Sequence, residues 1–207
     1  MEGIVAELLK TAGSAENNDS SVNFVTRNFD NAADAARHFE LVTRKLFDIK
    51  EWSKSSTPSE YAVFDASGAE QPHRPLAEGD FIRILLHGSG KYDWVRLIEI
   101  HEGARETVFK VKPTYDPTAK DVDTSVISHF LSGEAENNFC VALDRNTVGF
   151  YVIGLREKQN TDRSGGIVES ARNVAAANLG YYLGIQKSVW KEFCTNMLQS
   201  DGRDIDE

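Results

Sequence analysis

The feature that most constrains this chain is its C-terminal stretch, residues 167–198, where apolar residues recur at three- and four-residue steps. Such spacing predicts one helix, roughly 48 Å long at about 1.5 Å per residue. No charged residue occurs between Arg172 and Lys187. A surface helix carries charge on its outer face, so we expect this segment to close over a sheet and to be covered on more than one side. A row of small residues would let a neighbour approach closely: Ala176, Gly180, Gly184 and Ser188.

The sequence upstream of this helix predicts an α+β domain. Residues 22–29 suit a strand, and a helix over 32–49 follows, with Asp30 or Asn31 as its cap. From there to residue 157 the sequence reads as strands separated by glycine, proline and asparagine turns. Short connections predict antiparallel hairpins, because parallel strands need long crossovers. The expected strands are 60–66, 80–88, 92–102, 106–112, 125–132, 138–144 and 147–157.

The two ends of the chain read as extensions of this domain. Residues 2–12 form a short amphipathic helix, and the polar stretch that follows is a linker, so this helix is either free or docked. The last seven residues are an acidic tail. We therefore expect an N-terminal helix and linker over 1–21, one domain over 22–200 and a tail over 201–207.

Composition excludes several classes of function. The 207 residues carry a net charge of −9, which argues against nucleic acid and anionic membrane surfaces as partners. No apolar run reaches the roughly 20 residues that a membrane span requires. The N-terminus lacks the basic region of a signal peptide, so a cytoplasmic location is expected. With only Cys140 and Cys194, a disulfide scaffold is not indicated, although a bond between these two stays open.

The order of strand, helix, antiparallel strands and long terminal helix resembles the helix-grip fold of the START-related superfamily. This group includes birch-pollen-allergen proteins, aromatase/cyclase-type proteins and chaperone-activator domains. The segment from Pro75 to Arg83 and the place of Trp52 after the first helices are similar to many members. The resemblance spans residues 22–198 and implies a curved sheet of about seven strands gripping the terminal helix, with an apolar ligand between them. A cone-shaped fold of the nuclear-transport-factor type is the rival, but it ends in strands.

The hairpin around residues 88–91 supplies the first candidate site. A four-residue turn would pair Arg83 with Arg96 and place Trp94 on the same face, while Ile82 and Val95 share the other. Directly opposed like charges cost energy unless an anion lies between them, so Arg83 and Arg96 would bind a carboxylate or phosphate. The alternative is that both arginines face solvent and pair with Glu99 or another acid.

Tyr181 and Tyr182, in the uncharged centre of the terminal helix, are the other candidates. A buried tyrosine needs a partner for its hydroxyl, and cavity lining and ordinary packing explain them equally well. The five histidines show no metal-ligand spacing, and neither cysteine adjoins a basic cluster that would activate it. No metal, cofactor or catalytic constellation is expected. The candidate ligand-binding residues are Arg83, Trp94, Arg96, Tyr181 and Tyr182.

Three functions are compatible with these observations. The first is a binding protein for a small apolar or amphipathic molecule. The second is a cyclase- or hydrolase-like enzyme that uses the same cavity, although no paired carboxylates or nucleophile and base occur at a telling spacing. The third is a protein-interaction domain of the chaperone-activator kind, in which the N-terminal helix makes contacts, and a homodimer is compatible with the sequence. Fold alone does not separate them.

Overall fold

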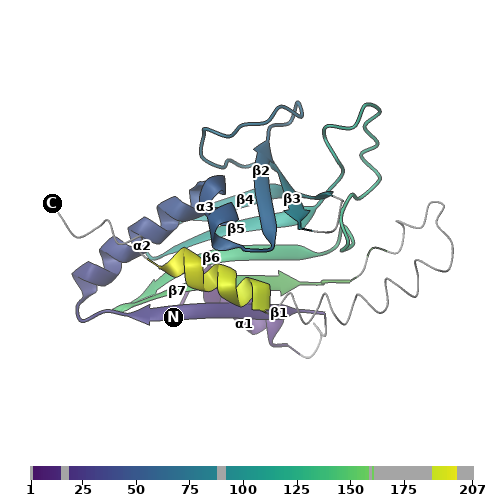
Figure 1. The fold of residues 1–207 in the computed structure, drawn as a ribbon. Helices are drawn as coiled ribbons and strands as arrows, with labels where there is room; N and C mark the ends of the chain where they lie inside the picture. Colours follow the sequence, from purple (N-terminus) through teal and green to yellow (C-terminus); the bar gives the residue numbers. More distant parts are fainter. Residues whose placement is uncertain (1, 15–18, 88–91, 159, 161–187, 200–207) are drawn as a thin grey trace.

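The computed structural model describes residues 2–14, 19–87, 92–158, 160 and 188–199. These residues contain three labelled helices, a helical segment at 188–198 and seven strands in one antiparallel sheet (Figure 1). The strand order is β1-β7-β6-β5-β4-β3-β2. The elements are α1 (Ile4–Ala12), β1 (Ser21–Asn28), α2 (Ala32–Phe47), α3 (Ile49–Ser55), β2 (Ser59–Phe64), β3 (Phe81–Leu86), β4 (Tyr92–Glu102), β5 (Glu106–Pro113), β6 (Glu136–Asp144) and β7 (Thr147–Leu155).

The connections explain the strand order. From β2 to β7, each strand pairs with the next one in the chain, as short connections favour. The exception is the step from β1 to β2, which lie at opposite edges of the sheet, and α2 and α3 make that crossing. The predicted α+β fold with a curved seven-stranded sheet and a C-terminal helix is confirmed.

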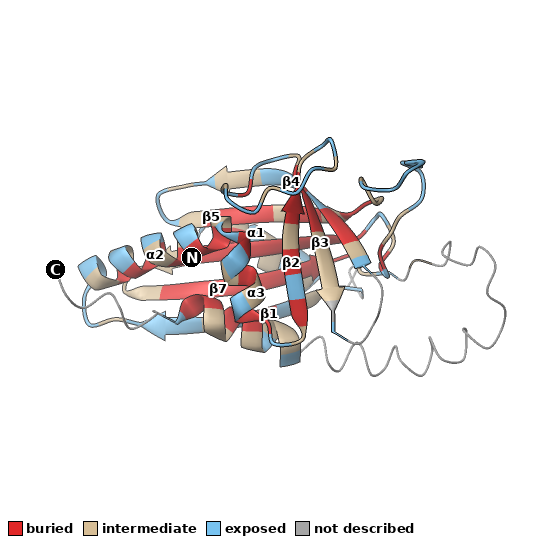
Figure 2. Cartoon of the chain, turned by 45° about the horizontal axis from the view of Figure 1, so that its top comes forward, coloured by how far each residue is buried: buried red, intermediate tan, exposed pale blue. Residues whose placement is uncertain are grey.

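The two faces of the sheet are covered differently. The concave face packs against α2, α3 and residues 188–198, and this side holds the main apolar core. The convex face packs against α1, which inserts Val5 over β5, β6 and β7. Figure 2 shows buried residues along the central strands and exposed residues along the outer sides of the helices. Of the two alternatives for the N-terminal helix, the docked one is observed.

Helix α2 is shorter than expected at its C-terminal end. Asn31 caps its start, and its side-chain oxygen accepts the N–H of Asp34. The predicted helix over 32–49 ends at Phe47, because Asp48 adopts an extended conformation and its carboxylate accepts the N–H of Lys50. Asp48 thereby begins α3, which turns Trp52 into the core.

The predicted strand over 125–132 is wrong. Its region begins with a turn in which the Asp123 carboxylate accepts both the N–H and the hydroxyl of Ser125. Ser128 then accepts the N–H of Trp94 and donates its own N–H to Thr114, so the backbone bonds go to two different segments. Because residues 125–132 do not pair along their length with one neighbouring strand, they form a loop.

The predicted pairing of β3 with β4 is wrong by two residues. Arg83 lies opposite Trp94, and Arg96 lies opposite Phe81. A shift of two keeps every side chain on its expected face. The pairing of β6 with β7 is regular through Gly149 and Gly154. The observed irregularity lies between Leu97 and Glu99.

The C-terminal helix is held at its last turn by two buried side chains of α2. His38 contacts the carbonyl oxygen of Leu198 at 2.8 Å through Nε2. The ammonium group of Lys45 donates to the carbonyl oxygens of Asn196 and Gln199, each at 3.0 Å. Unpaired carbonyls at a helix end favour such donors and positive charge. The rest of the expected helix over 167–198, with Tyr181 and Tyr182, lies outside the described residues.

Candidate functional site

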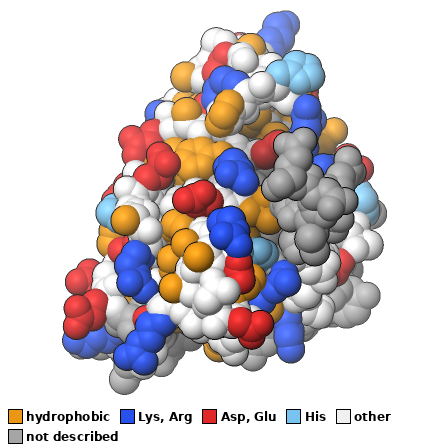
Figure 3. Space-filling view, turned by 90° about the vertical axis from the view of Figure 1, so that its left-hand side faces the viewer, with side chains coloured by type: hydrophobic (Ala, Val, Ile, Leu, Met, Phe, Trp, Pro, Cys, Tyr) orange, Lys and Arg blue, Asp and Glu red, His pale blue; other side chains and the backbone are white. Residues whose placement is uncertain are grey.

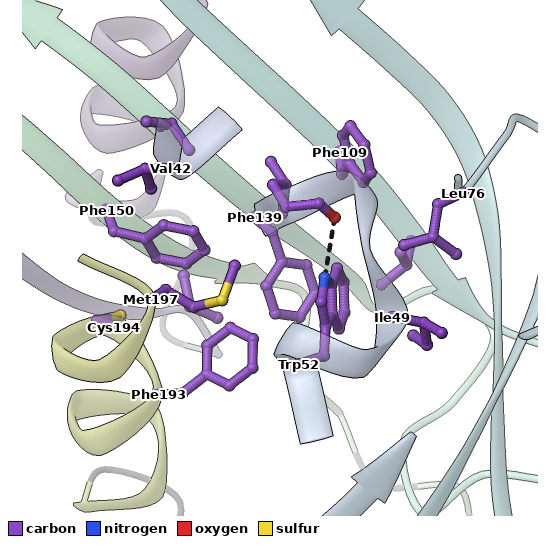
Figure 4. Packing of buried hydrophobic residues seen from close by; sticks show 14 of the residues in the cluster. Val42, Ile49, Trp52, Leu76, Phe109, Phe139, Phe150, Phe193, Cys194 and Met197 are labelled. Atoms are coloured by element: carbon purple, nitrogen blue, oxygen red, sulfur yellow. Dashed lines mark hydrogen bonds between the residues drawn. The ribbon is translucent and has the colours of Figure 1, made fainter. Parts of the chain in front are cut away.

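The concave face carries a continuous group of aromatic rings. Phe193, from the C-terminal helix, lies 5.8 Å from Phe150 and 5.9 Å from Phe139, measured between ring centroids. Trp52 lies 4.5 Å from Phe139, and its indole N–H donates to the carbonyl of Leu46 (Figure 4). These side chains come from α3, the C-terminal helix and two central strands, and they form an apolar wall.

Trp190 extends this wall toward the N-terminal side of residues 188–198. Its ring lies 5.6 Å from Phe139 and 5.7 Å from Phe193. The indole N–H is buried, yet no acceptor lies within hydrogen-bond distance in the described part of the chain. A buried donor without an acceptor costs free energy, so this group marks a place where an acceptor would be stabilised.

Tyr61 gives the wall a second polar group. Its ring lies 5.7 Å from Trp52 and 6.2 Å from Phe193. Burial raises the pKa of Tyr61 to about 12, and the neighbouring Ser56 and Ser59 hydroxyls oppose part of that rise. Its hydroxyl therefore stays protonated across the physiological range.

One edge of the same face is polar. Asn137 pairs with Gly154 across β6 and β7, and its amide donates to the Glu157 carboxylate at 2.8 Å. A side chain at position 154 would meet that carboxylate, because an added Cβ would lie 2.2 Å from its oxygen. Asn137 is two residues from Phe139 on the same strand and so shares its face. The sequence analysis did not identify Glu157 as a candidate site residue. The signal that could have found it is Gly154, three residues before Glu157, because a glycine opposite Asn137 leaves room for the carboxylate.

On the convex face, a small hollow of about 40 Å³ lies beneath α1. It has room for a few water molecules and is far smaller than the several hundred Å³ of ordinary ligand pockets. Asn138 contributes a fully buried side chain whose Oδ1 has no donor among the described residues. The lining residues are Ile4, Leu8, Glu99, His101, Val108, Lys110 and Asn138.

Three of the predicted ligand-binding residues lie together on the convex face. Arg83, Trp94 and Arg96 point away from the face that carries the C-terminal helix, since the intervening Ile82 and Val95 belong to the main core. Trp94 is buried against Phe64 and Phe81, and its indole N–H has no acceptor among the described residues. The alternative prediction is that both arginines face solvent and pair with Glu99 or another acid. Arg96 is exposed and Arg83 is partly buried, but Glu99 contacts Lys110.

The cysteines are buried and form no disulfide with each other. Burial raises the pKa of Cys140 strongly and that of Cys194 to about 12, so neither thiol is an activated nucleophile. Among the residues that the structure describes, no three histidine, cysteine or acidic side chains group in a way that could hold a metal ion. In the same part of the chain, no helix has the length and apolar character to cross a membrane.

Charge is mixed on the surface. In the view of Figure 3, basic and acidic side chains alternate around exposed hydrophobic groups, with no broad field of one sign among the described residues. On this side, the described residues therefore form no single acidic patch.

No protein-family model matches the sequence, and no curated protein matches it either. Solved structures do resemble it. A hypothetical protein from Helicobacter pylori has 13% identity and a TM-score of 0.52, with 91% of each chain covered. A protein from Thermus thermophilus has 9% identity and a TM-score of 0.46, covering 86% of this chain and 94% of its own.

An aromatase/cyclase, Zhui, from Streptomyces sp. R1128 has 11% identity and a TM-score of 0.40, covering 88% of this chain and 98% of its own. The likeness to the Helicobacter protein, at this level of identity, concerns the fold alone.

Proposed function

We propose that the concave face binds a small apolar or amphipathic molecule at its Trp190 end. The observation that carries the proposal is the buried indole N–H of Trp190, which lies among aromatic rings without an acceptor in the described part of the chain. Ligand sites are mostly apolar and contain a few polar groups that orient the ligand. An acceptor atom on a ligand would satisfy this N–H while the ligand's apolar part contacts Phe139.

Asn137 and Glu157 supply the polar edge of the proposed site. The Glu157 carboxylate accepts a hydrogen bond from Asn137 and keeps further capacity as an acceptor. A hydroxyl on the ligand would therefore find an acceptor at Glu157. The proposal also assigns Tyr181 and Tyr182 to the lining, on sequence grounds. It involves binding and no reaction.

The protein-interaction alternative has less support. Helix α1 uses its apolar side to cover the convex face, where Val5 is fully buried beside Cys140 and Ile153. Glu106 accepts the N–H groups of Ile4 and Val5 and holds the start of this helix. While α1 is docked, its apolar side is not available to a partner.

Native mass spectrometry of freshly purified protein tests the proposal. We expect an adduct that is released on denaturation and identified as an organic molecule. Trp190→Phe keeps an aromatic ring but removes the N–H, so it should weaken binding of that molecule about fivefold or more. Trp94→Phe, on the other face, is the matched control and should bind as the parent does. A bare protein that also fails to bind apolar probes would contradict the proposal.

A further inference from the structure

The convex face holds a second feature that is independent of the proposed apolar ligand. Three positive side chains come from neighbouring strands of the sheet. Arg96 lies directly opposite Lys112 on β5, and on its other side it lies opposite Phe81 on β3. Arg83, two residues from Phe81, shares this face and is diagonal to Arg96. The sheet therefore brings three cations together on one surface.

Arg83 is held between two aromatic rings. Its guanidinium carbon lies 4.9 Å from the ring centroid of Phe64 and 4.6 Å from that of Tyr92. Stacking of this kind fixes the plane of the guanidinium and leaves the N–H groups at its edge free to donate. Much of the entropy cost of ordering the side chain is thus met before any ligand binds.

The donors of Arg83 have no acceptor in the described part of the protein. Only two of the described arginines are partly buried, Arg74 and Arg83. Arg74 donates two hydrogen bonds to the Asp80 carboxylate, at 2.6 and 2.7 Å. Arg83 contacts no carboxylate within ion-pair distance there. The difference is notable because a guanidinium that loses part of its water normally gains a partner.

The nearby carboxylates are already engaged. Glu60, diagonal to Arg83 across β2 and β3, contacts His87 at 3.0 Å. Glu136 accepts a hydrogen bond from Arg156 at 2.6 Å and lies 3.7 Å from Lys112. Arg96 donates through Nε to the carbonyl of Gly79 at 3.3 Å, which anchors it without neutralising it. Counting the described residues, the group keeps an excess of positive charge.

We propose that Arg83, together with Arg96 and Lys112, binds an oxyanion on the convex face. Like charges in neighbouring positions repel each other, and an anion between them removes that cost. A planar guanidinium donates two parallel hydrogen bonds to a carboxylate or a phosphate, so either group fits. The exposed ring of Tyr92, with 46% of its surface accessible, offers a contact for the part of the ligand that carries the anion.

Heteronuclear NMR of the full chain tests this site. Inorganic phosphate and acetate are titrated separately at constant ionic strength, with sodium chloride as the reference. We expect saturable shifts of the Arg83 Nε–H and Trp94 indole N–H signals with at least one oxyanion. Saturation by both indicates a general oxyanion site, and saturation by phosphate alone indicates a phosphate site. Linear shifts that match those with chloride would overturn the proposal.

Variants distinguish binding at this site from a nonspecific effect of removing one positive charge. Arg83→Gln should weaken oxyanion binding about tenfold or more, because it removes the planar donor pair. Arg83→Lys keeps the positive charge but loses the two parallel N–H donors of the guanidinium, so it should weaken oxyanion binding less than Arg83→Gln does. Arg44→Gln removes an exposed arginine of α2 and should leave binding unchanged. Lys112→Gln removes a second positive charge of the site without changing Arg83, and it should also weaken oxyanion binding. Equal affinity in Arg83→Gln and Arg44→Gln, with both folded, would overturn the proposal.

Discussion

The two faces of the sheet differ in how their apolar side chains are connected. On the concave face they form one continuous cluster that joins three helices to the strands. On the convex face they form two separate clusters, one beneath α1 and one around Trp94. Charged side chains such as Arg96, Lys112 and Glu136 lie on that same convex side. The larger, continuous cluster predicts that the concave face contributes more to stability than the convex face, which accommodates charged side chains.

The largest expected effect is the loss of a concave aromatic ring. Phe193→Ala removes a fully buried side chain that contacts several other rings, and it should lower the free energy of unfolding by about 3–5 kcal/mol. Urea denaturation measures this. Phe24→Ala, on the convex side of β1 with 55% of its surface accessible, should cost less than about 1 kcal/mol. Equal costs for the two variants would contradict the difference in stability between the faces.

Alkaline pH provides a second test of the concave face. Tyrosine in the unfolded chain ionises near pH 10, but the buried Tyr61 has its pKa raised to about 12. The unfolded state therefore loses this proton first, and stability should fall between pH 10 and about 12, by roughly 2–3 kcal/mol. Tyr61→Phe should show a shallower fall in urea denaturation across that range. The same slope in parent and variant would show that Tyr61 is not buried as described.

The end of the C-terminal helix provides a third, smaller effect. Lys45→Met removes the donor to the carbonyls of Asn196 and Gln199 while keeping most of the apolar side chain. It should lower the free energy of unfolding by about 1–3 kcal/mol, because two helix-end carbonyls lose a charged partner. Thermal and urea unfolding measure this. Lys50→Met, at an exposed position of α3, is the control and should change stability little.

The smallest effect is expected where α1 meets the convex face. Glu106→Gln weakens the acceptor for the N–H groups of Ile4 and Val5 and removes a negative charge at the helix start. The cost should be about 1 kcal/mol. Hydrogen exchange should become faster in residues 4–12 while the strands keep their protection. Glu102→Gln is the control, and faster exchange throughout the sheet would contradict local docking.

The alternation of side chains made the faces of β3 and β4 predictable from sequence, but not their register. Ile82 and Val95 point to the core as expected, since period-two alternation determines the face. A shift of two residues preserves that alternation, so the pattern could not show that Arg83 meets Trp94 instead of Arg96. Register depends on the turn and on packing with neighbouring strands, which local sequence patterns do not contain.

The candidate site was harder to predict than the fold. Glu157 reaches Asn137 only because β6 and β7 pair in one particular register, and the two residues are 20 apart in the chain. Likewise, the position of the Trp190 indole, whose N–H has no acceptor in the described part of the chain, depends on contacts between the C-terminal helix and β6. The spacing of apolar residues in helices and strands, by contrast, is a local property of the sequence. It therefore predicted the order of the elements.

The indole N–H signals of the three tryptophans test the division between the two faces most directly. Trp52 and Trp190 belong to the concave face, and Trp94 belongs to the convex face. Titration with 2-naphthol, a neutral apolar probe that carries one oxygen, should produce a saturable shift of the Trp190 signal and leave the Trp94 signal unchanged. A saturable shift of Trp94 alone, or no saturable shift of either signal, would contradict the proposed concave binding site.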